Sequence, residues 1–246
     1  LIDTAGVRTT YGSAVYADHV PLEHATVVQR VLDAGVTILG KANLAEFAWG
    51  VLGVNEWYGT VHNPVRPGRT TGGSSSGNAA AIAGGLCDLG IGTDTGCSIR
   101  LPAAACDLVG LKSRLGVVPT DGVFPLCPSF DTVGPLGRTV ADVARLWSVL
   151  SGRPVPAPRL DGLTIGLLRR APALGDGRAT EESDAAEARV GELERLGARV
   201  VEAAIPGPDV EVIARAPTHP APSTMPSAAI SSSAWTTAYV ALPVSG

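Results

Sequence analysis

The segment Gly92-Thr93-Asp94-Thr95-Gly96-Cys97-Ser98-Ile99-Arg100 joins an expected strand to an expected helix. Residues 88–93 form a glycine-containing apolar run typical of a strand, and a helix is expected from about Ser98. The glycine at the turn lets consecutive backbone N–H groups point in one direction. A helix N-terminus stabilises negative charge, and acyl transfer needs a hydroxyl beside such donors. The segment therefore predicts a strand–turn–helix unit that offers both a nucleophile and an oxyanion hole.

A second segment, Thr71-Gly72-Gly73-Ser74-Ser75-Ser76-Gly77-Asn78, opens an Ala-rich helix expected over residues 76–86. It also places hydroxyls beside free N–H groups at a helix N-terminus. Taken singly, each segment is explained more simply as a glycine-rich turn with an N-cap serine, because short motifs match by chance. Two such segments separated by one helix favour a catalytic function.

Outward from these segments, strands alternate with helices, which predicts a three-layer α/β architecture. A turn-rich stretch with two prolines, residues 54–71, is expected to be a loop. Residues 206–246 form an Ala/Pro/Ser-rich tail, expected to be disordered or non-native. The remaining expected elements are helices over 23–34, 43–49, 140–150 and 180–196, and strands over 36–39, 163–168 and 198–202.

Composition excludes several classes of function. A net charge of −4 provides no basic surface for nucleic acid, and no apolar stretch is long enough to span a membrane. We see no basic n-region followed by an apolar h-region and so expect no secretory signal, and the cysteines show no CxxC spacing. We therefore expect no metal, no cofactor, and a cytoplasmic location with reduced, mostly buried thiols. The four cysteines are Cys87, Cys97, Cys106 and Cys127.

The two segments belong to a longer pattern. Gly72–Gly77 is followed by Gly92–Ala103, and the pattern continues through residues 110–112, 131–135 and 138–142, with residues 40–47 upstream. This pattern resembles the amidase signature family over roughly residues 1–205. The resemblance implies an α/β fold with three layers, a mixed central sheet flanked by helices. Residues 1–205 would then be a partial catalytic domain.

The resemblance also implies a Ser–Ser–Lys triad. Ser98 matches the nucleophile, and Ser74 matches the serine that passes a proton between lysine and nucleophile. Asp94, Arg100 and Ser75 match positions that support the loop, although a surface ion pair is an alternative for Asp94 and Arg100. Cys97 stands where many members have glycine and is expected to be a small residue turned away from the site. The matched oxyanion-hole donors are the backbone N–H groups of Thr95, Gly96, Cys97 and Ser98.

The lysine of the family lies in a Lys-Asp pair just upstream of the stretch that here reads Leu1–Gly6. We therefore expect this chain to lack that lysine and to be impaired, and we expect a C-terminal portion of the family to be missing. Lys41 matches a non-catalytic family segment, and Lys112 belongs to a Gly-Leu-Lys segment that we interpret as structural.

The expected function is hydrolysis of carboxamide C–N bonds through a serine acyl-enzyme, with a small-molecule amide as substrate. A stand-alone amidase is preferred, and a homodimer is left open. The alternatives are a non-catalytic truncated amidase-like domain and the A subunit of a glutamine-dependent tRNA amidotransferase, which requires partner subunits. An α/β-hydrolase elbow at Gly73–Gly77 fits poorly, because no apolar strand precedes it and only His219 follows. A phosphate-binding loop fits poorly too, because no Gly-Lys-Ser/Thr follows the glycines.

Overall fold

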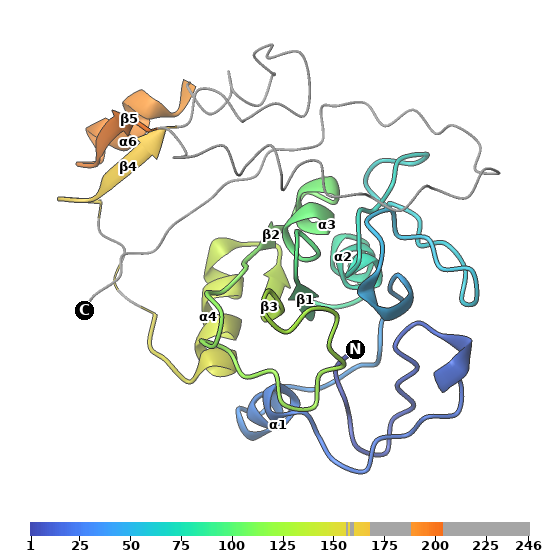
Figure 1. Ribbon diagram of the computed structural model, residues 1–246. Coiled ribbons are helices and arrows are strands. Elements are labelled where there is room, and N and C mark those ends of the chain that lie inside the picture. The colour runs from blue at the N-terminus through green and yellow to red at the C-terminus, as the bar shows by residue number, and fades with distance from the viewer. Residues whose placement is uncertain (156, 158–159, 168–187, 204–246) are drawn as a thin grey trace. The chain divides into compact units, whose positions relative to one another are not determined.

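The computed structural model describes residues 1–155, 157, 160–167 and 188–203 (Figure 1). The chain divides into two compact units, Leu1–Pro156 and Ala157–Gly246. The expected tail over residues 206–246 and most of the first half of the expected helix 180–196 lie outside the described residues. The boundary expected near residue 205 stays a prediction.

Three antiparallel strands form the sheet of the first unit. They are β1 (Leu89–Asp94), β2 (Val109–Gly110) and β3 (Thr132–Gly137), in the order β1-β3-β2. Every residue of β3 is buried, as expected for the central strand. Val133 and Leu136 of β3 lie three positions apart and therefore point to opposite faces. Each is fully buried in a different hydrophobic cluster.

Helices cover both faces of this sheet, as Figure 1 shows. On the Val133 face the core includes side chains of α1 and α4, and on the Leu136 face it includes side chains of α2 and of the α3 segment. The three-layer α/β prediction is therefore confirmed. The helices are α1 (Thr26–Asp33), α2 (Ser76–Ala83), α3 (Arg100–Ala105) and α4 (Val140–Ser151), with short 3-10 turns η1 (Ala14–Tyr16) and η2 (Glu46–Ala48).

Two expected elements of the first unit are wrong. Residues 36–39 form no strand in the described structure, and Leu39 is 73% exposed, so the run is not the buried strand that its apolar composition indicated. Residues 43–49 contain only the short η2, because Phe47 and Ala48 adopt positive φ angles of 50° and 62°, which an α-helix does not tolerate. The strands β2 and β3 were not predicted.

The second unit contains a parallel pair of strands, β4 (Thr164–Leu167) and β5 (Arg199–Glu202), with α6 (Val190–Arg195) between them in sequence. Both strands were predicted, and α6 lies inside the expected helix. The strand pair of this unit is thus parallel, whereas the sheet of the first unit is antiparallel. Among the helices of the described residues, none has the length and apolarity to cross a membrane.

Candidate active site

Ser98 lies in the turn that joins the end of β1 to the start of α3, as the sequence predicted. The next residue, Ile99, is fully buried and anchors the turn in the core. Glycines of the neighbouring strands make room for the Ile99 side chain. A Cβ on Gly110 would come within 2.9 Å of Ile99 Cγ2, and one on Gly134 within 3.0 Å of Ile99 Cδ1. Close packing of small residues therefore fixes where the Ser98 turn begins its helix.

The glycine- and serine-rich segment before α2 lies against this turn. Ser75 N donates to Ser98 O at 3.2 Å, and Ser75 Oγ donates to Thr93 O at 3.4 Å. Ser74 is 1% exposed and follows a cis peptide bond from Gly73. Among the described residues, Ser74 Oγ is the buried side-chain oxygen with no hydrogen-bond partner. The two segments that the sequence singled out are thus in direct contact.

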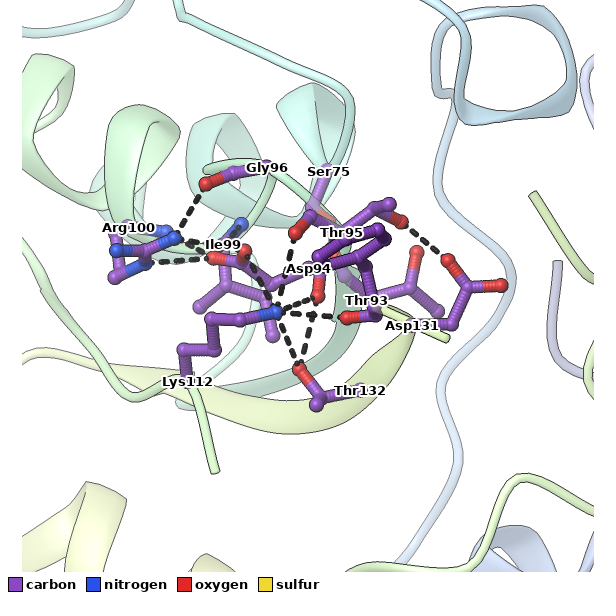
Figure 2. Close-up of polar contacts among 11 residues, drawn as sticks. Ser75, Thr93, Asp94, Thr95, Gly96, Ile99, Arg100, Lys112, Asp131 and Thr132 are labelled. Carbon is purple, nitrogen blue, oxygen red and sulfur yellow. Dashed lines mark hydrogen bonds and ion pairs between the residues drawn. The ribbon is translucent and has the colours of Figure 1, made fainter. Parts of the chain in front are cut away.

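Asp94 is the buried anchor of the turn. Its Oδ2 accepts from Ile99 N at 3.1 Å, from Arg100 N at 3.3 Å and from Arg100 Nε at 3.0 Å, and its Oδ1 lies 3.4 Å from Lys112 Nζ (Figure 2). Burial alone raises the pKa of Asp94, but hydrogen bonds from Arg100 and the Ile99 amide, with the charges of Arg100 and Lys112, bring the pKa below its ordinary value. The alternative of a surface ion pair is wrong, because the Asp94 side chain is 0% exposed.

Four consecutive backbone N–H groups face away from these contacts. In the described part of the chain, the amides of residues 95–98 donate no hydrogen bond, whereas those of Ile99 and Arg100 both donate to Asp94. Unpaired neighbouring amides at a strand-to-helix turn form an anion-binding arrangement. A Cβ on Gly96 would meet no atom within 4 Å, so open space adjoins the loop there.

Cys97 does not resemble a nucleophile. Burial and the nearby charge of Asp94 raise the pKa of the Cys97 thiol, so it stays protonated at neutral pH. All four cysteines are free thiols. Cys106 is buried and the other three are partly exposed, so the expectation that most would be buried is wrong.

A cavity of about 220 Å³ lies beside Thr95. Asp131 is one of its lining residues and connects the turn at Thr95 to the segment of residues 126–127. Its Oδ1 accepts from Thr95 Oγ1 at 2.5 Å, while its Oδ2 accepts from Leu126 N and Cys127 N, both at 2.9 Å. The lining includes Thr95, Val123, Phe124, Pro125, Leu126 and Asp131. Polar and apolar side chains line this cavity in similar measure, and it is large enough for a small organic group.

A family model described as amidase matches residues 1–218. The chain belongs to the amidase signature family.

Relatives of known name place the chain within that family. It is 40% identical over 229 residues to the A subunit of the Glutamyl-tRNA(Gln) amidotransferase of Natronomonas pharaonis, covering 86% of this chain and 53% of the relative. It is 42% identical to the corresponding protein of Symbiobacterium thermophilum, covering 83% and 45%. The native peptide amidase of Stenotrophomonas maltophilia superposes with a TM-score of 0.73 at 36% identity, covering 83% and 46%. The chain thus spans about half the length of the relatives it matches.

Within this amidase-family chain, the contacts that two residues outside the loop make with it were not predicted from the sequence. Lys112 was interpreted as structural, and the described contacts agree with this: its Nζ donates to the carbonyls of Asp94 and Thr95 in the turn before Ser98. Asp131 lies in a segment that carried the resemblance, but no role was assigned to it. The available signal was that Lys112 is one of only two lysines in the sequence. The other, Lys41, donates to Ile2 O and to Thr4 Oγ1.

Proposed function

We propose that this chain carries the acyl-transfer site of an amide hydrolase, with Ser98 as the nucleophile. The observation that carries the proposal is the run of four amides at residues 95–98, which donate no hydrogen bond within the described part of the chain and end at Ser98 itself. Ser98 Oγ attacks the carboxamide carbon, and the carbonyl oxygen gains negative charge that these amides stabilise. The C–N bond then breaks, the amine takes a proton and leaves, and water hydrolyses the Ser98 ester.

Ser74 is proposed to carry the proton. Its Oγ is buried and has no hydrogen-bond partner among the described residues, and the amide of the next residue, Ser75, donates to Ser98 O at 3.2 Å. The base that the resemblance assigns is a lysine in a Lys-Asp pair. Lys112 does not fit that role, because its Nζ is surrounded by carbonyl oxygens of the oxyanion turn and of Phe130.

The first experiment tests the nucleophile and the base together. The 246-residue chain and a version with a family-type Lys-Asp segment joined before Leu1 are treated with a fluorophosphonate probe and with simple carboxamides. We expect fast labelling and turnover in the extended version, slow labelling in the other, and neither when Ser98→Ala is introduced. Substantial turnover by the Ser98→Ala variant would exclude Ser98 as the nucleophile. Rapid labelling of the unextended chain would show that another base serves.

Glutamine hydrolysis as the A subunit of a tRNA amidotransferase is the second candidate. It is favoured by the names of the curated relatives at 40% and 42% identity. The test compares ammonia release from glutamine with release from peptide amides and simple carboxamides. Preference for glutamine, together with co-purification of other subunits, would select the amidotransferase. Turnover of small amides by the isolated chain or its homodimer would select the stand-alone amidase. No turnover by either form would select the non-catalytic domain.

The substrate class and the location belong to the same proposal. The cavity beside Thr95 supports a small-molecule amide, because its volume of about 220 Å³ accepts a small group only. The cytoplasmic location stays a prediction, and fractionation of cells that express the protein tests it.

A further inference from the structure

We propose that Lys112 is a positioning residue that aligns the oxyanion amides. This inference rests on the proposed function, since the amides matter only if charge develops beside them. Lys112 Nζ donates to the backbone carbonyl of Asp94 and, at 3.3 Å, to that of Thr95 (Figure 2). It also donates to Phe130 O at 3.0 Å and Thr132 Oγ1 at 3.2 Å. One ammonium group thus joins the end of β1 to the start of β3.

The geometry of the peptide bond turns these contacts into an orientation. In a planar trans peptide, the C=O of one residue and the N–H of the next point in opposite directions. The peptide bonds of this turn are trans. Because Lys112 holds the carbonyls of Asp94 and Thr95, the N–H groups of Thr95 and Gly96 point away from the ammonium group, towards the opposite side of the turn.

Two further donors extend the same arrangement along the chain. Arg100 Nη2 donates to Gly96 O at 2.5 Å, which turns the Cys97 N–H away from the guanidinium group. Leu101 N donates to Cys97 O at 2.8 Å, and this turns the Ser98 N–H away from the Leu101 amide. Four consecutive carbonyls, those of residues 94–97, are therefore held, and the four amides of residues 95–98 have no acceptor among the residues that the structure describes. Lys112 is responsible for the first two of them.

The position of Lys112 suits this role better than a purely packing role. Its side chain is only 25% exposed, and the turn carbonyls of Asp94 and Thr95 are among its hydrogen-bond partners. Thr132 Oγ1 supports the arrangement by donating to Asp94 O at 2.9 Å. A preorganised oxyanion hole lowers the energy of the transition state without strengthening ground-state binding. Loss of alignment should therefore reduce kcat and leave KM unchanged.

The kinetic experiment uses Lys112→Met, which removes the ammonium group and keeps the apolar stem, in the version of the chain that hydrolyses amides. We expect kcat to fall about 10²-fold, the loss typical of one oxyanion donor, with KM unchanged. Thr132→Val should lower kcat in the same direction and Thr132→Ser should restore it. The control is Arg138→Met, because Arg138 also donates to backbone carbonyls, those of Ile82 and Cys87, but away from the turn. It should leave kcat unchanged.

A second measurement does not depend on turnover. NMR relaxation gives order parameters for the amides of Thr95, Gly96 and Cys97 in the 246-residue chain. We expect values near those of rigid backbone, about 0.85, in the wild type and in Arg138→Met, and a decrease for Thr95 and Gly96 in Lys112→Met. Unchanged order parameters and amide shifts in Lys112→Met would overturn the inference, as would a kcat equal to that of the wild type.

These two measurements separate the inference from the function on which it rests. If no version hydrolyses any amide, the proposed function fails, and the order parameters still decide whether Lys112 aligns the turn. If Lys112→Met does not fold, the Thr132→Val and Thr132→Ser pair decides instead. Equal kcat in that pair would then overturn the inference.

Discussion

At the residue scale, the adjacent serines Ser74 and Ser75 differ in their hydrogen bonding. Ser74 Oγ is buried at 1% residue exposure and has no hydrogen-bond partner among the described residues. Leaving a buried hydroxyl unpaired costs about 1–3 kcal/mol. Its neighbour Ser75 is also buried but donates to Thr93 O. The two adjacent serines therefore differ in a way that a mutation can measure.

Replacing Ser74 with alanine should abolish turnover without lowering stability. Alanine removes the unpaired oxygen and keeps Cβ, so the free energy of unfolding should stay equal to that of the wild type or rise by up to about 1 kcal/mol. Urea unfolding and amide hydrolysis measured on the same preparation check both effects. The control is Ser75→Ala, which removes a buried hydrogen bond and should destabilise the protein. A clear loss of stability in Ser74→Ala would show that its hydroxyl has a structural partner.

At the scale of secondary structure, the central strand β3 was the element hardest to predict. Its sequence, Thr-Val-Gly-Pro-Leu-Gly over residues 132–137, contains two glycines and a proline, which are depleted in strands. Pro135 is tolerated because of its place in the sheet. Its carbonyl accepts from Leu111 N at 3.2 Å, just beyond the end of β2, so its ring nitrogen faces the side where β2 has ended. Only the pairing partners show this, and they are distant in sequence.

Within the site, the residues that were predicted lie close together in sequence, whereas the contacts that were missed join residues distant in sequence. Ser74, Ser98 and the turn amides lie in two short contiguous segments whose pattern is visible in the sequence. Lys112 lies 18 residues from Asp94 in sequence, and most of its contacts are to backbone carbonyls. Backbone acceptors leave no signature in residue types, so only the folded structure reveals these contacts. The prediction of a strand over residues 36–39 was wrong for a related reason: a strand needs a pairing partner, and an apolar run alone does not supply one.

Replacement by alanine should change stability differently at two glycines, Gly134 in β3 and Gly96 in the turn after β1. A Cβ on Gly134 of β3 would lie 2.2 Å from Leu111 O, a backbone atom that cannot rotate away. Gly134→Ala should therefore destabilise the protein by about 1–3 kcal/mol. Gly96→Ala should leave stability near that of the wild type, because its Cβ would meet no atom within 4 Å. Thermal unfolding of the two variants checks this, and equal melting temperatures would contradict the packing described for β3.

At the scale of the whole molecule, the chain is negatively charged, whereas cations outnumber anions around Asp94. The chain has a net charge of −4, yet two cations, Arg100 and Lys112, surround the carboxylate of Asp94, which is the buried acid among the described residues. Removing one partner of a buried ion pair costs about 3–5 kcal/mol, because the remaining charge loses its compensation. The stability of the folded chain should therefore depend on the ionisation of Asp94.

The direction of this pH dependence follows from the lowered pKa of Asp94. Well above the unfolded-state pKa of about 3.9, the carboxylate is charged in both states and its interactions contribute in full. As the pH falls below that value, the unfolded chain takes up the proton first, so stability is lost until the pH has passed the folded-state pKa.

Asp94→Asn isolates this contribution from that of other acids. The variant should be less stable than the wild type at pH 7, and the difference in unfolding free energy should shrink as the pH falls below about 4. Urea unfolding at a series of pH values measures the difference. The control is Asp88→Asn, because Asp88 pairs with Arg138 at 3.3 Å but its side chain is 97% exposed. A surface pair contributes little, so that variant should follow the wild type at every pH. A difference for Asp94→Asn that is constant with pH would mean that its carboxylate does not titrate with folding, and the charge network around the turn would then not stabilise the molecule.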